Sequence, residues 1–285
     1  MLSRGGALAH SSDDLGAARA RRENFPVASR LLPRPVRRHL LAVYGYARYV
    51  DDVGDEAEPA DRPALLDAVD ADLDRLYAGA APRLPVVRAL APTVAACSIP
   101  AEPFRRLVRA NRQDQTVTRY ETFTDLLSYC ELSANPVGRI VLHVFDAATP
   151  ARQELSDRIC SALQVIEHCQ DVGEDHARGR IYLPGADLRR FGCADADLAG
   201  PATPVRLRRV VALQAARAAR LLDQGAPLVG TLDGFARTAV SGYLAGGRAT
   251  MAALSRGRYD VLRRRLRPRP ARLLAEWVLI LTRGR

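Results

Sequence analysis

Cysteine is scarce in this sequence, and no two cysteines are arranged as a recognisable pair. The five are scattered without a C-x-x-C motif, at Cys97, Cys130, Cys160, Cys169 and Cys193. This pattern argues against a disulfide framework or a zinc site and favours a reducing compartment. The N-terminus has no apolar segment typical of signal peptides, and no run of 18 apolar residues occurs. We therefore expect a cytoplasmic protein without a transmembrane helix.

Nucleotide-binding signatures are also absent. There is no Walker A sequence and no G-x-G-x-x-G, which argues against a P-loop or Rossmann site but leaves other nicotinamide-binding modes open. The net charge of +10 fits either a solvated arginine-rich surface or attraction to anionic lipid or polyphosphate. The basic clusters lack interleaved aromatic residues, so we expect no nucleic-acid partner.

Aromatic residues make up only 6% of the chain, and leucine, alanine and arginine dominate it. Apolar residues recur at spacings of three and four, which predicts helices and few strands. We expect a poorly ordered N-terminus over 1–17 and then a single all-α domain over 18–285. The predicted helices cover 18–29, 36–55, 62–78, 84–97, 101–112, 122–130, 152–176, 205–226, 232–256 and 270–283. A break is predicted at 133–139 and a long loop at 184–203.

Two acidic motifs carry the chemistry. The first contains Asp51 and Asp55, and the second contains Asp171 and Asp175. Residues four apart share one face of a helix, so each pair could present two carboxylates together. Spacing alone is weak support, because Asp70 and Asp74 form a third such pair, which we interpret as solvated helix surface. The first motif ends its helix, where the dipole disfavours anions and bound Mg²⁺ would offset that cost.

The neighbours of the two motifs distinguish them from the third pair. Arg48, with Tyr44 one turn earlier, lies on the predicted stripe of Asp51 and Asp55, either as a plain ion pair or as a diphosphate contact. Before the second motif, polar residues at helical spacing interrupt an apolar segment. They are either inward-facing acids, whose burial metal ions would compensate, or a polar stripe on the surface. This polar stripe consists of Gln164, Glu167 with His168, Asp171 and Asp175. After it, Arg178, Arg180 and Tyr182 suit either a lid over polyphosphate or a surface loop. Because Mg²⁺ prefers oxygen ligands, neither His168 nor His176 is assigned as one.

Several linked segments together resemble the squalene/phytoene synthase family over roughly residues 18–260. The chain looks most like the hydroxysqualene synthase branch of the bacterial hopanoid pathway. The matching segments agree in order and spacing: Glu23 to Ser29, Tyr44 to Glu56, Ser133 to Arg139 and Gln170 to Pro184. The resemblance implies an isoprenoid-synthase helical bundle with a central cavity.

The resemblance also implies roles for individual residues. Asp51, Asp55, Asp171 and Asp175, with Glu167, would bind several Mg²⁺ ions together with the substrate diphosphate. Arg48, Arg178 and Arg180 would contact the diphosphate. Asn24, Phe25, Tyr44, Gln164 and Tyr182 would complete the substrate site. Tyr129, Val137, Gly138 and Leu163 would border the hydrocarbon cavity.

The sequence departs from the family pattern beside the second motif. Glu167 replaces the usual asparagine, so a charged carboxylate stands in place of a neutral ligand. His168 and Cys169 replace bulky aromatic residues, which should change the local packing. Glu131 and Leu132 stand where arginines are common, which removes positive charge.

The implied activity is Mg²⁺-dependent conversion of presqualene diphosphate and water to hydroxysqualene and diphosphate, with no need for NADPH. One alternative is head-to-head condensation of two prenyl diphosphates to presqualene diphosphate, squalene or phytoene. A second alternative is an inactive homologue that binds prenyl lipids or serves in assembly.

The C-terminal segment bears on partners. Arg263, Arg264, Arg265 and Arg267 precede an amphipathic stretch. This stretch is either a final core helix or a peripheral contact with the inner face of an anionic membrane. The sequence does not predict an oligomeric state.

Overall fold

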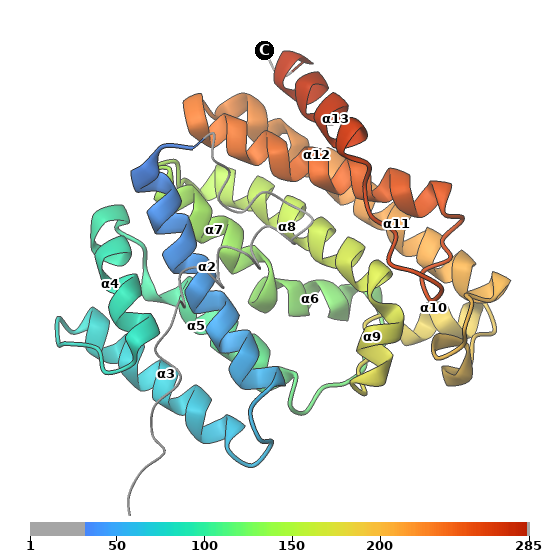
Figure 1. Ribbon diagram of the computed structural model, residues 1–285, viewed down its shortest axis with the longest axis horizontal. Helices are drawn as coiled ribbons and strands as arrows, with labels where there is room; N and C mark the ends of the chain where they lie inside the picture. Colours follow the sequence, from blue (N-terminus) through green and yellow to red (C-terminus); the bar gives the residue numbers. More distant parts are fainter. Residues whose placement is uncertain (1–31, 284–285) are drawn as a thin grey trace, which may run out of the picture.

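The computed structural model describes residues 32–283, and within them the chain is helical with no strand (Figure 1). A single isolated bridge pairs Arg119 with Ile181. The predicted all-α class is therefore confirmed. The predictions for residues 1–17 and 18–29 lie outside the described residues. The helices are α2 (Arg34–Asp55), α3 (Arg62–Tyr77), α4 (Pro85–Cys97), α5 (Ala101–Gln113), α6 (Phe123–Ser133), α7 (Asn135–Val144), α8 (Pro150–Gln170), α9 (Val172–Ala177), α10 (Gly185–Arg190), α11 (Val205–Gly225), α12 (Gly234–Arg256) and α13 (Pro270–Arg283), with 3-10 turns η1 (Asp195–Leu198) and η2 (Ala226–Thr231).

Proline and capping residues explain where several helices begin. Pro35 lies in the first turn of α2, where a missing N–H costs no helical hydrogen bond. Thr122 caps α6 by accepting the Asp125 N–H. The predicted break after α6 is confirmed, because Ala134 separates it from α7 and Pro136 lies in the first turn of α7.

Two predictions about the second half of the chain are wrong. The helix expected over 152–176 is interrupted at Asp171, whose φ of −104° and ψ of 16° separate α8 from α9. The side chain of Gln170 donates to the Leu266 carbonyl at 2.6 Å and so ties the interruption to the segment after α12. The loop expected over 184–203 contains α10 and η1. It is held inward because buried Asp187 of α10 pairs with Arg217 of α11.

The prediction that Asp70 and Asp74 lie on a solvated helix surface is confirmed only in part. Asp74 is exposed and Asp70 is half-buried, and both pair with arginines of α5. Asp72 between them is buried instead, and its carboxylate accepts the backbone N–H groups of Arg83 and Leu84 at 2.7 and 2.8 Å. This acid satisfies donors at the start of α4, which periodicity alone could not reveal.

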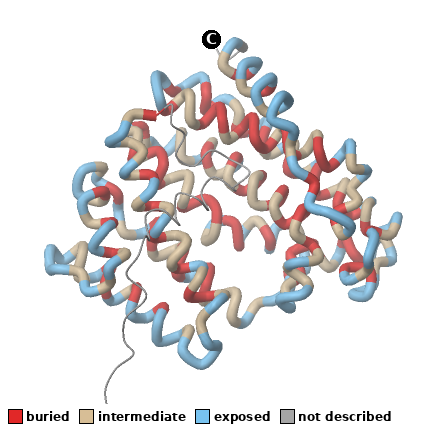
Figure 2. Tube along the Cα trace, viewed as in Figure 1, coloured by how far each residue is buried: buried red, intermediate tan, exposed pale blue. Residues whose placement is uncertain are grey.

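The helices pack around two hydrophobic clusters that meet at α7. One cluster joins α2, α3, α4 and α5, through residues such as Tyr46, Leu66 and Phe104. The other joins α6, α8, α11 and α12, through residues such as Ile166 and Leu222. Figure 2 shows buried residues along the helices in the middle of the molecule and exposed residues mainly at its margin. The first acidic motif ends a helix of one cluster and the second ends a helix of the other, so the motifs meet between the two halves. No helix among residues 32–283 is long and apolar enough to cross a membrane.

Candidate functional site

The first acidic motif occupies the last turn of α2. Asp51 keeps access to solvent, and its Oδ1 accepts a hydrogen bond from Asn111 Nδ2 of α5 at 3.1 Å. Loss of hydration among the surrounding side chains raises the pKa of Asp51 to about 6, although the Asn111 hydrogen bond and the nearby charge of Arg48 oppose that rise. A carboxylate that is costly to ionise here is suited to a bound cation.

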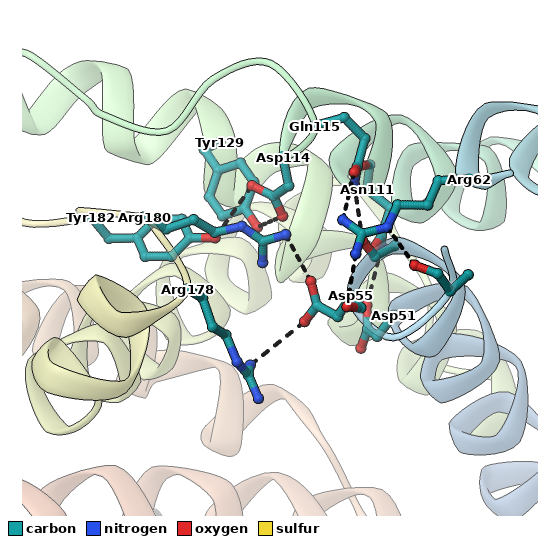
Figure 3. A network of polar contacts seen from close by, with 12 residues as sticks. Asp51, Asp55, Arg62, Asn111, Asp114, Gln115, Tyr129, Arg178, Arg180 and Tyr182 are labelled. Carbon is teal, nitrogen blue, oxygen red and sulfur yellow. Dashed lines mark hydrogen bonds and ion pairs between the residues drawn. The ribbon is translucent and has the colours of Figure 1, made fainter. Parts of the chain in front are cut away.

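Polar side chains of neighbouring helices close the end of α2. Arg62 Nη2 donates to the Asp55 carbonyl at 3.1 Å, and Gln115 Nε2 donates to the Gly54 carbonyl at 3.1 Å. The terminal carbonyls of a helix have no partner within it, so these contacts satisfy them. Figure 3 shows Arg62, Asn111 and Gln115 gathered at this point. The end of α2 is therefore held in place independently of the Asp51 and Asp55 carboxylates.

Gly54 is required by the close approach of α5. A Cβ at this position would lie 2.1 Å from Asn111 Oδ1, whereas a Cβ at Gly45 in the same helix would meet nothing within 4 Å. We therefore expect Gly54→Ala to displace Asn111 from Asp51 and to destabilise the fold by about 1–3 kcal/mol. Urea unfolding measures the loss, and Mg²⁺ titration of activity should show a higher requirement. Gly45→Ala is the matched control, and equal stability of both variants would contradict the expectation.

The second motif lies at the interruption between α8 and α9. Asp171 Oδ2 accepts a hydrogen bond from Arg265 at 3.0 Å, while Asp171 Oδ1 is buried without a hydrogen-bond partner among the described residues. Desolvation raises the pKa of Asp171 to about 6, against the opposing effect of the Arg265 charge. The Asp175 N–H donates to the Asp171 carbonyl at 2.8 Å, so the two acids remain one turn apart despite the interruption.

Two arginines that follow the second motif reach the first motif. Arg180 Nη2 lies 2.7 Å from Asp55 Oδ1, and Arg178 Nη1 lies 3.7 Å from Asp55 Oδ2. The segment is directed there by its backbone, because the Arg180 N–H donates to the Asp175 carbonyl at 2.9 Å. Figure 3 shows both guanidinium groups pointing at Asp55. The two motifs, far apart in sequence, thus form one charged site.

A buried cluster of aromatic and acidic side chains lies beside Arg180. Tyr129 and Tyr182 both donate to Asp114, at 2.7 and 3.2 Å. The His168 ring stacks on Tyr182 with centroids 3.8 Å apart. Burial raises the pKa of Asp114, while these hydrogen bonds and the positive charge of Arg180 oppose the rise. Both tyrosine hydroxyls are therefore occupied, and their rings form a wall next to the charged site.

His168 takes over the packing role expected of an aromatic residue. It is buried, and its Nε2 lies 3.2 Å from Gln164 Nε2, one turn earlier on α8. Its Nδ1 lies 3.7 Å from Asp175 Oδ2. His168 thus places a polar ring at this position, where it contacts Gln164, Tyr182 and Asp175.

Arg48 lies on the same helix as Asp51 and Asp55, as predicted, but its ion pairs are formed with other acids. Arg48 instead pairs with Asp52 one turn later at 2.9 Å and approaches Glu56 at 3.8 Å. An i,i+4 pairing brings the two side chains together along the helix, and Asp52 satisfies it. Arg48 still lies near enough to lower the pKa of Asp51, so it borders the site rather than joining its centre.

The remaining predicted residues lie in different surroundings. Tyr44 is half-buried one turn before Arg48, and Glu167 is half-buried one turn before Asp171. Gly138 lies where α7 approaches α8, and a Cβ there would meet Cys160 Sγ and Ser156 Oγ at 2.4 Å. Its visible role is thus close helix packing.

Two apolar residues and two N-terminal ones complete the predicted set. Val137 packs against the cluster around α2, and Leu163 packs against the cluster around α11. The predicted substrate residues Asn24 and Phe25 lie outside the described residues.

Three residues of the site escaped sequence reasoning. Asn111 and Asp114 belong to a polar run at the end of α5, Asn111 to Gln115, whose density of amides and acids was the available signal. Arg265 was counted only as part of a basic cluster. Its contact with Asp171 spans 94 residues of chain, and no local pattern predicts it.

The donor set suits Mg²⁺ that arrives with a diphosphate. Among residues 32–283, no three histidine, cysteine or acidic side chains gather into a complete metal site. Mg²⁺ commonly binds one or two carboxylates and completes its shell with waters and substrate phosphates. The buried, unpartnered Oδ1 of Asp171 is an open oxygen of this kind. The residues therefore fit the ion.

Comparisons with known proteins identify the family of this chain. A family model described as squalene/phytoene synthase matches residues 18–272. The chain is 34% identical over 207 residues to a hydroxysqualene synthase of Zymomonas mobilis, covering 71% of this chain and 68% of that protein. It is 31% identical over 258 residues to a 15-cis-phytoene synthase of Synechococcus elongatus, covering 85% and 83%.

Solved structures agree with the fold. The crystal structure of the squalene synthase HpnC from Alicyclobacillus acidocaldarius superposes with a TM-score of 0.78 at 42% identity, over 87% of this chain and 94% of that one. A dehydrosqualene synthase superposes with a TM-score of 0.83 at 23% identity, over 94% and 95%, which supports the fold alone. The matching family model and these relatives show that this chain, whose helical fold the solved structures share, belongs to the squalene/phytoene synthase family.

Proposed function

We propose that the chain is an Mg²⁺-dependent enzyme that converts presqualene diphosphate and water to hydroxysqualene and diphosphate. The observation that carries the proposal is the approach of Arg178 and Arg180 to Asp55, which unites both acidic motifs with two guanidinium groups. Carboxylates that hold cations, set beside arginines, form a suitable site for a diphosphate. Relatives that are named hydroxysqualene synthase support the choice of reaction.

The two acidic motifs would hold the metal. Asp51 and Asp55 on one side, and Asp171 and Asp175 on the other, would bind Mg²⁺ together with the substrate diphosphate, and Glu167 would add a further carboxylate. When bound, Mg²⁺ would stabilise the negative charge of the departing diphosphate.

Three arginines would contact the diphosphate directly. Arg178 and Arg180 would exchange their contacts with Asp55 for diphosphate oxygens, because bidentate guanidinium contacts orient a phosphate as well as neutralise it. Arg48, held beside Asp52, would approach from α2.

The reaction balances without a reductant. The carbon–oxygen bond to the diphosphate breaks, and both electrons leave with the diphosphate. The cyclopropylcarbinyl cation rearranges, a water oxygen adds to it, and one proton is released to solvent. Apolar surroundings that include Val137 and Leu163, with the rings of Tyr129 and Tyr182, would limit premature capture of the cation. NADPH is not required for this outcome.

Product analysis tests the proposal. Incubation of the protein with presqualene diphosphate and Mg²⁺, without NADPH, should yield hydroxysqualene and an equivalent of diphosphate. Farnesyl diphosphate with and without NADPH is the parallel reaction. Formation of squalene or phytoene from a prenyl diphosphate, with no turnover of presqualene diphosphate, would contradict the proposal.

The second candidate is head-to-head condensation of two prenyl diphosphates. Relatives named phytoene synthase and the structural similarity to a protein named squalene synthase favour it. Consumption of farnesyl diphosphate in the parallel reaction would establish it. The remaining alternative, an inactive homologue that binds prenyl lipids or serves in assembly, requires that no Mg²⁺-dependent release of diphosphate occur with any of these substrates.

A further inference from the structure

The last helix, α13, is apolar on two opposite faces. Its inner face packs along α12, where Ile280 is buried and Trp277 Nε1 donates to Ser241 Oγ at 2.9 Å. Leu273 lies half-buried on the same side. These contacts make the inner face part of the fold and leave the outer face of the helix to be explained.

The opposite face carries an exposed apolar stripe. Leu274 is 57% exposed and Val278 is 52% exposed, one turn apart, and Leu279 beside them is 37% exposed. Ala271 and Ala275 continue the exposed stripe. A second apolar face on a helix whose first apolar face is already packed in the core normally contacts another protein or a lipid phase. Figure 1 shows α13 at the margin of the molecule, beyond α12, and Figure 2 shows its outward side exposed.

The charged residues that immediately precede the stripe in the sequence are all positive. Six arginines occupy the ten residues from 263 to 272, and no acid lies among them. Arg264, Arg267 and Arg269 are exposed and make no ion pair with the part of the chain that the structure describes. The one acid of α13, Glu276, is buried and paired with Arg272 at 2.5 Å. An anionic surface would therefore meet only positive and apolar groups here.

We propose that the α13 stripe (Ala271, Leu274, Ala275, Val278 and Leu279) and the arginines preceding it dock the protein on an anionic lipid bilayer. The helix has 14 residues, about 21 Å at 1.5 Å per residue, which is too short to cross a hydrocarbon core of about 30 Å. It would lie in the plane of the interface, with its apolar side chains inserted and the arginines among the headgroups.

The docking segment is joined directly to the charged site. Arg265, within the arginine-rich segment, donates to Asp171, and the neighbouring Leu266 carbonyl accepts the Gln170 side chain. Membrane contact would therefore place the second acidic motif close to the bilayer. The docking proposal itself depends on the stripe and its charges and does not require any particular reaction.

Vesicle flotation of the full chain tests the proposal. Binding to vesicles of phosphatidylglycerol and phosphatidylcholine is expected, with at least a tenfold weaker association for phosphatidylcholine alone. The double variant Leu274→Ser, Val278→Ser should lower the partition coefficient by about tenfold or more. The variant Arg264→Gln, Arg267→Gln, Arg269→Gln should also lower it by about tenfold or more, since basic residues near an anionic surface strengthen binding. Raising the salt concentration should weaken binding of the unaltered chain.

Leu65→Ser supplies the matched control. Leu65 is 36% exposed on α3, which packs against α2, α4 and α5, so its replacement should leave binding unchanged. Binding of the Leu274, Val278 double variant at the level of the unaltered chain would overturn the proposal. Failure of the unaltered chain to bind would also overturn it. Light scattering would then show whether a second copy covers the stripe, as a dimer that the double variant converts to monomer.

Discussion

Asp171→Asn should lower turnover by roughly 10³-fold, which is the effect expected when an essential group is removed from a charge-stabilising site. The side chain offers a buried, unpartnered Oδ1 and is only 18% exposed. Asparagine keeps the shape and one oxygen but removes the charge that would hold Mg²⁺. Release of diphosphate from presqualene diphosphate at saturating Mg²⁺ measures the loss.

The same substitution should stabilise the metal-free protein at pH 8. Desolvation raises the pKa of Asp171 from 3.8 to about 6, so the folded state binds the proton more tightly than the unfolded chain does. The favourable contribution is complete below about pH 4 and is lost as the pH rises through about 6. Asparagine resembles the protonated acid and should restore about 1–2 kcal/mol, or a Tm increase of roughly 2–6 °C.

Mg²⁺ with inorganic diphosphate should reverse this difference. The unaltered protein should gain thermal stability when the ligands bind, whereas the asparagine variant should gain little. Asp74→Asn is the control, because Asp74 belongs to the third acidic pair and its carboxylate pairs with Arg105 on the surface. Full activity of Asp171→Asn, or a Tm below that of the unaltered metal-free protein, would contradict these expectations.

Arg180→Gln should lower kcat/KM by about 10²–10³-fold, because one positioned donor to a developing anion has that value in enzymes. Arg180 is only 13% exposed, lies 2.7 Å from Asp55 and also lowers the pKa of Asp114. Its loss would remove a nearby cation from the carboxylates of Asp55 and Asp114. We therefore also expect a decrease in the free energy of unfolding of about 2 kcal/mol.

Arg178→Gln provides the comparison within the same segment. Arg178 is 63% exposed and lies 3.7 Å from Asp55, so its replacement should act through KM, by about tenfold or less, with little change in Tm. Steady-state kinetics and thermal unfolding of the two variants distinguish the positions. If Arg180→Gln retained kcat/KM within about twofold of the unaltered enzyme, the diphosphate role of Arg180 would be wrong.

The helical class and most helix positions could be predicted from the sequence, because periodic apolar residues and prolines act locally. The helix over 36–55 and the break near Ala134 agree with the structure for this reason. The interruption at Asp171 could not be predicted, since contacts of Gln170 and Asp171 with the segment after α12 accompany it. Short helices inside 184–203 escaped prediction because buried Asp187 secures them through α11.

The residues of the candidate site likewise fall into those that the sequence predicts and those that only the fold brings together. Local spacing together with the neighbouring polar residues was sufficient to identify the two Asp pairs and the arginines after the second one, since residues four apart lie about one helical turn apart. Local spacing was insufficient for Arg48, which has Asp51, Asp52 and Glu56 nearby and pairs most closely with Asp52. The contacts of Arg180 with Asp55, of Arg265 with Asp171 and of Asn111 with Asp51 join segments that the fold alone brings together. Charge attraction and hydrogen bonding act over a few ångströms in space, whatever the separation along the chain, so the acidic motifs are encoded locally and their partners are selected by packing.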